Sequence, residues 1–238
     1  MINYENPPEN MLKTDVTNCR KCDRLVAFRE KVALEKKPAY SDLPYWGRPV
    51  VSFGDNNASL LICGLAPAAH GGNRTGRMFT GDRSGDFLYA SLHRCGYANQ
   101  PYASGFDDGL YLTDTYITAV VRCAPPQNKP LPSERDNCIG FLLDEISGLK
   151  NLKTILALGG FAYDSLWRIK DFSPTKRVDE TVKHRLKKPK FCHGLEVSFN
   201  EKITLICSYH PSQRNVFTKV LTEEMFDRIL YRCKELSE

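Results

Sequence analysis

Four short runs of apolar residues along the chain have the length of strands buried on both faces. Each run is followed at once by Gly, Pro or polar residues. A continuous apolar run of this length is typical of a strand that helices cover on both sides. The predicted strands are Leu60–Leu65, Tyr116–Val121, Thr154–Leu158 and Ile203–Ser208.

The segments between and after these runs have helical periodicity. Ser133 can cap the amino end of one of them, and apolar residues then recur at helical spacing up to Ile146. The predicted helices are Gly85–Arg94, Ser133–Leu149, Phe161–Ile169 and Leu221–Leu236. Strands that alternate with helices pair in parallel, so we predict an α/β fold: a three-layer α/β/α sandwich with a central four-stranded parallel sheet.

Parallel pairing brings the carboxyl ends of all four strands to one edge of the sheet. Folds of this class place their working residues in the loops that leave that edge. Here these loops begin at Ala66, Arg122, Gly159 and Tyr209. We therefore expect the functional site to be built from them.

Length and composition indicate an ordinary globular protein. The chain has 238 residues, of which 42% are hydrophobic and 26% are charged, and we predict one domain over residues 1–238 with an amino-terminal, cysteine-bearing extension. It contains no apolar run of the roughly 20 residues that a membrane span needs. Residues 1–11 lack the basic start and apolar middle of a signal peptide, which predicts a cytoplasmic protein without a membrane partner.

Charge adds little on its own. The net charge of +5 permits binding to nucleic acid without requiring it. Basic residues gather between Lys170 and His193, with Arg185, Lys187, Lys188 and Lys190 close together. This stretch reads either as a solvated loop or as a contact with the DNA backbone.

The nine cysteines are more informative. Their number is odd and no export signal is visible, so a disulfide framework is not expected. Cys63, Cys95 and Cys207 lie in or near apolar stretches and are typical of small core residues, whereas Cys192 and Cys233 have no evident role. Four others remain: Cys19, Cys22, Cys123 and Cys138.

These four residues form two pairs, a C-x-x-C pair and a pair that flanks the loop after the second strand. Four thiolates can hold a tetrahedral zinc ion or a [4Fe–4S] cluster, and cysteine chemistry alone does not separate the two. Unligated core cysteines and a redox pair are the alternatives. A metal site here would tie the amino terminus to a loop in the middle of the chain.

The loop after the first strand is rich in glycine. Residues 64–77 contain four glycines, which let the backbone approach a ligand closely. Neither a Walker sequence nor G-x-G-x-x-G is present, so this is not a standard nucleotide loop. Phe79 follows between glycine-bearing turns, where it can present its ring to a planar ligand or pack in the core.

The loop after the last strand carries His210, Pro211, Ser212, Gln213, Arg214 and Asn215. Pro211 restricts the backbone, so that His210 is held rigidly at the carboxyl edge of the sheet. Arg214 and Asn215 can contact phosphates or base edges.

Together, these loops and cysteines resemble the family 5 (type B) uracil-DNA glycosylases, over nearly the whole chain from Cys19 to the last helix. The matching motifs are Gly64-Leu65-Ala66-Pro67-Ala68, Arg74-Thr75-Gly76-Arg77, Arg122-Cys123-Ala124-Pro125-Pro126 with Asn128, and His210-Pro211-Ser212 with Asn215.

The resemblance implies hydrolysis of the N-glycosidic bond of uracil in DNA, with hypoxanthine and other altered bases as further substrates. It also implies that Cys19, Cys22, Cys123 and Cys138 ligate a structural [4Fe–4S] cluster. The implied base-binding residues are Gly64, Leu65, Ala66, Pro67, Ala68, Phe79 and Asn215. The implied DNA contacts are Arg74, Arg77, Ser212, Gln213 and Arg214. DNA is the expected partner, a monomer the expected state, and a sliding clamp a further candidate partner.

The chemistry requires a donor to the departing uracil and a group that positions water. His210 is the expected donor to the charge that develops on a uracil carbonyl. Many uracil glycosylases place Asp or Asn after the first strand to position water, but Ala68 or Ala69 stands there. Asp82 is our first choice instead, with a helix N-cap as its alternative role, and Asn128 and His70 are the other candidates.

No lysine stands in the context of a nucleophile, so we expect a monofunctional enzyme that leaves an intact abasic site. Two other classes of function compete with this interpretation. The first is an iron–sulfur nucleic-acid-binding protein without catalysis, which the missing Asp or Asn favours. The second is a zinc-stabilised hydrolase of small molecules.

Overall fold

The computed structural model describes residues 16–170 and 187–237, and its centre is a six-stranded sheet. The strands are β1 Phe53–Gly54, β2 Leu60–Gly64, β3 Thr115–Ala119, β4 Thr154–Leu158, β5 Glu196–Ser198 and β6 Thr204–Ser208. They lie in the order β1-β3-β2-β4-β6-β5. The inner four are parallel, which confirms the predicted sheet, and β1 and β5 add short antiparallel edges.

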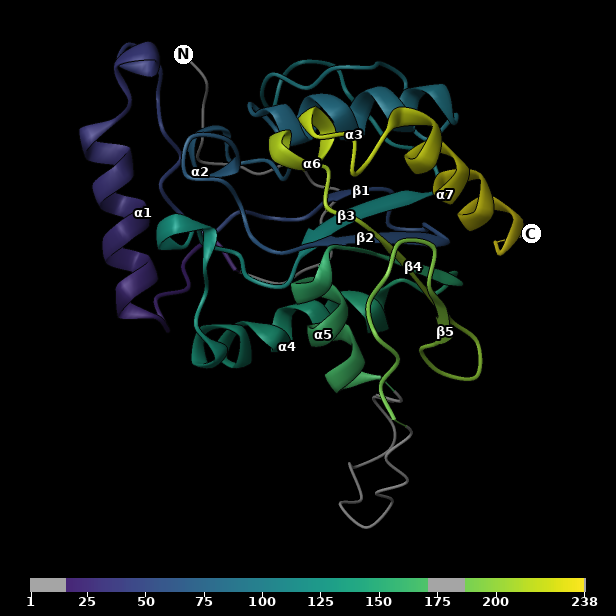
Figure 1. Ribbon diagram of the computed structural model, residues 1–238. Coiled ribbons are helices and arrows are strands. Elements are labelled where there is room, and N and C mark those ends of the chain that lie inside the picture. Colours follow the sequence, from purple (N-terminus) through teal and green to yellow (C-terminus); the bar gives the residue numbers. More distant parts are fainter. Residues whose placement is uncertain (1–15, 171–186, 238) are drawn as a thin grey trace.

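Helices cover both faces of the sheet (Figure 1). α3 (Arg83–Arg94) and α7 (Glu223–Glu235) lie on one face, and α4 (Pro132–Gly148) and α5 (Gly160–Ile169) lie on the other. Successive residues of a strand point to opposite faces. Accordingly, Leu60 and Ile62 belong to the core under α3 and α7, while Leu61 belongs to the core over α4 and α5. The three-layer sandwich is confirmed.

Several elements were not predicted. Helix α1 (Asp23–Glu35) lies beside the sandwich, close to α2 (Gly72–Thr75), as Figure 1 shows. The others are α2 itself, the edge strands β1 and β5, α6 (Gln213–Phe217) and the 3-10 helices η1 (Pro38–Tyr40) and η2 (Pro126–Asn128). Helix α1 follows the C-x-x-C pair directly, because Cys22 is its N-cap residue.

A buried ion pair fastens α4 to the sheet. The guanidinium of Arg122, which follows β3, donates to the carboxylate of Glu145 on α4 and to the hydroxyl of Ser52. Glu145 also accepts hydrogen bonds from Ser52 Oγ at 2.6 Å and Thr118 Oγ1 at 2.7 Å. The carboxylate therefore joins three segments, and the loop between β3 and α4 is held at both ends.

The cysteines outside the two pairs behave largely as expected. Cys63, Cys95 and Cys207 are buried, which confirms them as core residues, and Cys233 is buried as well, whereas Cys192 is exposed. Of the basic stretch, residues 171–186, including Arg185, lie outside the described residues. Lys188 is exposed and pairs with Asp164 at 2.6 Å. No helix in the described ranges is long and apolar enough to cross a bilayer.

Candidate active site and four-cysteine site

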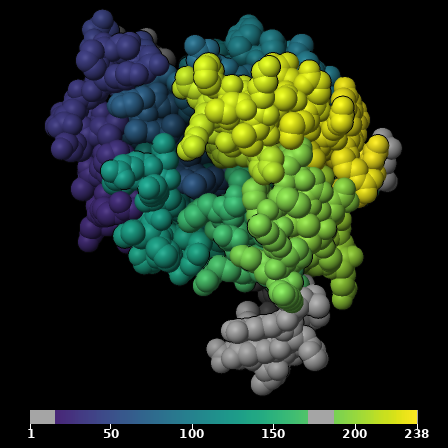
Figure 2. All heavy atoms as spheres, viewed as in Figure 1, coloured from purple at the N-terminus to yellow at the C-terminus, as the bar shows by residue number. Residues whose placement is uncertain are grey.

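A cavity of about 250 Å³ opens at the carboxyl edge of the sheet, between the loops that follow β2, β3 and β6. The space-filling view shows the molecule hollowed between the teal segment around η2 and the yellow-green segment around α6 (Figure 2). Its lining residues are Leu65, Ala66, Pro67, Ala68, Met78, Phe79, Asp82, Ser84, Asn128, His210 and Ser212. All but Met78 and Ser84 were singled out from the sequence. Residues 65–70, which follow β2, are called the base-binding loop below, after the role that the family resemblance implies for them.

Phe79 forms one wall of the cavity and is held in an unusual backbone conformation. Its φ is +51°, a left-handed value that costs a bulky residue on the order of 1–3 kcal/mol. Its ring lies against the backbone of Gly64, where an added Cβ would stand 2.7 Å from Phe79 Cζ. Gly64 therefore supports the ring from behind and does not itself line the cavity. Only a residue without a side chain leaves room for Phe79 at this position.

His210 stands opposite Phe79, with the ring centroids 6.1 Å apart and the planes inclined by 31°. Asn215 Nδ2 donates to the His210 carbonyl oxygen at 2.9 Å, so Asn215 orients the loop without lining the cavity. Burial lowers the pKa of His210 to about 4. The imidazole is therefore neutral at pH 7, with one nitrogen that donates and one that accepts.

Asp82 has the N-cap role considered for it from the sequence, and it also lies at the cavity. Its Oδ1 accepts hydrogen bonds from the backbone nitrogens of Ser84 at 2.9 Å and Gly85 at 3.0 Å, so it is the N-cap of α3. The side chain also lines the cavity, and Oδ2 lies so close to Gly71 that a Cβ there would stand 2.1 Å from it. One oxygen is thus committed to the helix, and the other lies against Gly71, which follows the base-binding loop.

Asn128 reaches the same cavity from η2, and its φ of +56° is again left-handed. Asn tolerates this conformation better than most residues do. His70, the third candidate for positioning water, does not line the cavity. Its Nδ1 is 2.9 Å from the hydroxyl of Tyr45.

The arginines proposed as DNA contacts differ in their surroundings. The prediction for Arg77 is wrong: its side chain is only 1% exposed and pairs with Asp108, and its Cζ lies 4.9 Å from the centroid of the Phe53 ring. Arg74 is half-buried and donates to the carbonyl oxygens of His70 at 2.8 Å and Gly81 at 3.1 Å. It therefore braces the glycine-rich loop from within.

Exposed residues gather on α6, at the mouth of the cavity. Ser212 caps this helix and lines the cavity, and Gln213 and Arg214 are exposed, as a DNA contact requires. Phe217 is 86% exposed, and Val220 beyond it is 44% exposed.

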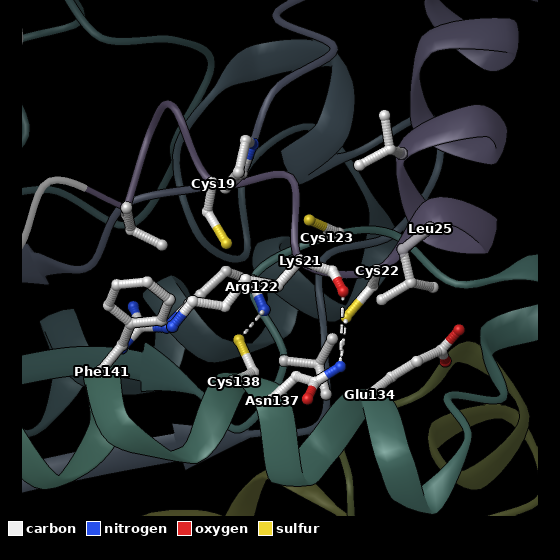
Figure 3. Close-up of a pocket in the computed structure, with 14 residues that line it drawn as sticks. Cys19, Lys21, Cys22, Leu25, Arg122, Cys123, Glu134, Asn137, Cys138 and Phe141 are labelled. Atoms are coloured by element: carbon white, nitrogen blue, oxygen red, sulfur yellow. Dashed lines mark hydrogen bonds between the residues drawn. The ribbon is translucent and has the colours of Figure 1, made fainter.

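The four cysteines singled out from the sequence come together. All of them line one cavity beside α1, and Figure 3 shows their side chains pointing toward one another from the amino-terminal loop, the end of β3 and α4. Within the described ranges, no three His, Cys, Asp or Glu side chains are grouped closely enough to hold a single metal ion. The four thiols are free of disulfides.

Hydrogen-bond donors point at three of the four sulfurs. Arg29 Nη1 lies 2.8 Å from Cys123 Sγ, and the backbone nitrogen of Arg122 lies 3.3 Å from Cys138 Sγ. Asn137 Nδ2 lies 3.5 Å from Cys22 Sγ. Burial raises the pKa of the Cys138 thiol to about 12 and raises that of Cys123 as well. A bound metal would deprotonate these thiols, and the donors would then face negative sulfurs.

Comparison with known proteins bears on both sites. Residues 51–234 match the uracil DNA glycosylase superfamily. A type-5 uracil-DNA glycosylase of Mycobacterium bovis is 48% identical over 223 residues, which cover 93% of this chain and 79% of the relative. One from Thermus thermophilus is 43% identical over 93% of this chain and 95% of its own length. This chain belongs to the type-5 uracil-DNA glycosylases.

A type-4 uracil-DNA glycosylase of Archaeoglobus fulgidus is also similar, with 31% identity over 44% of this chain. The likeness to the type-5 relatives is therefore both higher and longer. The described part of this type-5 chain brings together all four cysteines and most of the residues expected from the resemblance. Arg29 was missed, because an arginine on a polar helix reads as a solvated charge until its burial is known.

The contact between Gly64 and Phe79 yields a first prediction. In Gly64→Ala, the new methyl group must push the Phe79 ring into the cavity. We expect the free energy of unfolding to fall by about 1–3 kcal/mol, and the affinity for a uracil-containing duplex to fall with it. Denaturant unfolding and fluorescence anisotropy measure the two effects.

Gly140→Ala is the matched control, since Gly140 is exposed on α4 and a Cβ there meets nothing within 4 Å. This variant should be as stable as the wild type or more so, because alanine favours helix over glycine. If Gly64→Ala bound DNA as the control does, the ring would not be held by this contact.

Proposed function

We propose that this protein is a monofunctional glycosylase of DNA base-excision repair that hydrolyses the N-glycosidic bond of uracil and leaves an abasic site. The relatives named above are uracil-DNA glycosylases. The observation that carries the proposal is a cavity lined by both the Phe79 ring and the neutral His210 imidazole, whose centroids lie 6.1 Å apart. A flat heterocycle that develops negative charge requires a stacking face and a hydrogen-bond donor, and this cavity offers both.

The reaction begins with extrusion of the nucleotide from the duplex, because a stacked base cannot enter a cavity. Phe79 then offers a ring face for stacking, and backbone groups of the base-binding loop are available to the base edge. As the bond breaks, negative charge grows on uracil and positive charge on the sugar. A neutral His210 can donate a hydrogen bond from its ring N–H to a uracil carbonyl oxygen.

Asp82 is our choice for the group that positions water. A carboxylate accepts a hydrogen bond from the attacking water and favours the cationic sugar. Its Oδ1 is occupied by the backbone of α3, which fixes the side chain and leaves Oδ2 for this role. None of the residues that line the cavity is a lysine. This lining supports direct attack by water over attack by an amine of the protein.

The decisive experiment incubates the protein with duplexes that carry one U·G, U·A, hypoxanthine·T or T·G pair, followed by alkali. We expect one cut at uracil, made only after the alkali, and the other duplexes rank hypoxanthine and thymine as substrates. His210→Ala should lower the single-turnover rate about 10²–10³-fold, as loss of a donor to a developing anion does. His93→Ala, an exposed histidine on α3, is the matched control.

The pKa of His210 adds a dependence on pH to this prediction. Because it is lowered from 6.5 to about 4, the rate should show no inflection from His210 between pH 5 and pH 8. His210 in the unfolded chain binds a proton at a higher pH than it does in the folded protein, so His210 lowers the stability of the fold as pH falls from 6.5 toward 4.

Failure of the protein to cut any of the four duplexes, with DNA still bound, would favour the non-catalytic binding protein instead.

The exposed end of α6 supports duplex DNA as the partner. Phe217 and Val220 are exposed next to the basic residues Arg214 and Lys219, which is a composition suited to a groove with stacked bases and phosphates. We expect Phe217 to occupy the space that the extruded nucleotide leaves.

Phe217→Ala should therefore slow uracil excision from a U·A duplex at least tenfold more than excision from single-stranded DNA, which needs no such support. Single-turnover rates on both substrates measure the ratio. Tyr231→Ala, which removes an exposed aromatic ring from α7, should leave the ratio unchanged. Equal slowing on both substrates would exclude a role in extrusion.

We propose further that Cys19, Cys22, Cys123 and Cys138 hold a [4Fe–4S] cluster with a structural role. Four sulfurs around one cavity, three of them facing hydrogen-bond donors, suit a group of iron-bound thiolates. Each thiolate of such a cluster binds a different iron, so the four sulfurs need not converge on one point as they do around zinc. Bound there, the cluster would join the amino-terminal loop, β3 and α4.

This proposal predicts about four irons and four labile sulfides per chain, with broad absorbance near about 400 nm. Cys123→Ser should lose most of both and unfold at a lower temperature. Cys192→Ser, at an exposed cysteine, should keep the metal content of the wild type. A measurement of one zinc ion per chain and no labile sulfide would reject the cluster and favour a zinc site.

A further inference from the structure

Asn73 attaches the base-binding loop to helix α1. It lies on α2, is 0% exposed, and donates from Nδ2 to the carbonyl oxygens of Arg29 at 3.2 Å and Ala69 at 3.4 Å. Its backbone nitrogen donates to the Ala68 carbonyl at 3.0 Å, and its own carbonyl accepts from Gly47 at 3.0 Å. One buried side chain thus joins α1 to the loop that lines the cavity.

Arg29 continues this connection toward the cysteines. It is 2% exposed on α1, with Nη1 2.8 Å from Cys123 Sγ and Nη2 3.2 Å from the Cys19 carbonyl oxygen. In the described residues its one carboxylate partner is that of Glu30, 3.9 Å away on a 45% exposed side chain. A buried guanidinium needs a close negative partner. The Cys123 sulfur is the atom in position to supply it.

These contacts form a continuous path between two sites that are distant in the sequence. It runs from the Cys123 sulfur through the Arg29 side chain and backbone to the Asn73 amide, and from there to Ala68 and Ala69. Both side chains are buried, so water cannot easily replace a lost bond.

We propose that Arg29 and Asn73 are positioning residues that couple the four-cysteine site to the base-binding loop. The coupling rests on the metal centre and the glycosylase activity proposed above. Thiolates held by metal keep Arg29 in place, Arg29 keeps the α1 carbonyl facing Asn73, and Asn73 holds Ala68 and Ala69 at the cavity. Coupling of this kind is reciprocal: metal retention favours base binding, and base binding favours metal retention to the same extent.

Reciprocity gives a test with a readout other than catalysis. The loaded protein is exposed to an iron chelator, and loss of its visible absorbance is timed with and without a duplex that carries 2′-fluoro-deoxyuridine. The fluorine disfavours the cationic sugar, so the base is bound but not released. We expect this duplex to slow metal loss about fivefold or more in the wild type, and a duplex without uracil to slow it much less.

Asn73→Asp tests the path itself. The carboxylate keeps the size of the side chain but turns an oxygen toward the carbonyls of Arg29 and Ala69, so both donated bonds are lost. We expect the protection by the uracil analogue to disappear and the KM for the uracil duplex to rise more than kcat falls. Asn99→Asp is the matched control, because Asn99 also bridges a loop, to the Gly109 carbonyl at 2.9 Å, and lines neither cavity.

Arg29→Gln should remove the protection as well, and the double variant should lose no more than the more severe single variant, since both residues act on one path. Protection that persists in Asn73→Asp, whatever its thermal stability, would overturn the proposal. So would a loaded wild type that excises uracil but loses metal equally fast with and without the analogue. Absence of iron and sulfide from the wild type would instead reject the metal centre, and absence of excision would reject the enzyme.

Discussion

The parallel pairing of β3, β2, β4 and β6 is the constraint on which the rest of the structure depends. Parallel strands need crossovers that return the chain to the amino edge of the sheet, so every strand leaves the sheet at the same carboxyl edge. The base-binding loop after β2, Cys123 after β3 and His210 after β6 therefore all emerge at one edge of the sheet. The sheet topology thus brings residues of the candidate active site and Cys123 of the four-cysteine site to one edge, although the two cavities draw on residues far apart in the chain.

Within that frame, the site depends on backbone positions that are costly on their own. Phe79 and Asn128 both have left-handed φ values and both line the cavity. Such conformations persist only where the surrounding structure over-determines them. For Phe79 the restraints are visible: its ring fills the space that Gly64 leaves, and its carbonyl packs where a Cβ on Gly85 would stand 1.7 Å away. Gly64 and Gly85 therefore leave the space that fixes the Phe79 ring, in addition to any room that glycines here give a ligand.

The parts of the molecule that could be predicted from sequence are those with a local signature. Buried strands such as Thr154–Leu158 and amphipathic helices such as α7 have a periodicity of their own, and the loops after them inherit a position from topology. The edge strands β1 and β5 were missed because two or three half-exposed residues carry no apolar pattern. Arg77 was misplaced for a related reason: nothing local distinguishes an arginine that reaches DNA from one that pairs with Asp108 inside the protein. The pairing of distant residues decides such cases, and the sequence does not display it.

Two buried arginines next to the cysteines show how that pairing gives the molecule its charge balance. Arg122 is matched by Glu145 in the same core, so its charge is compensated within the protein. Arg29 lies against Cys123. Burial raises the pKa of the Cys123 thiol, so burial alone would keep this thiol protonated. A neutral thiol leaves the guanidinium poorly compensated, whereas a metal-bound thiolate compensates it fully. The metal-bound state proposed above would therefore suit the fold around α1 better than the free thiols, and under the proposed coupling the same arginine would connect that state to the base-binding loop.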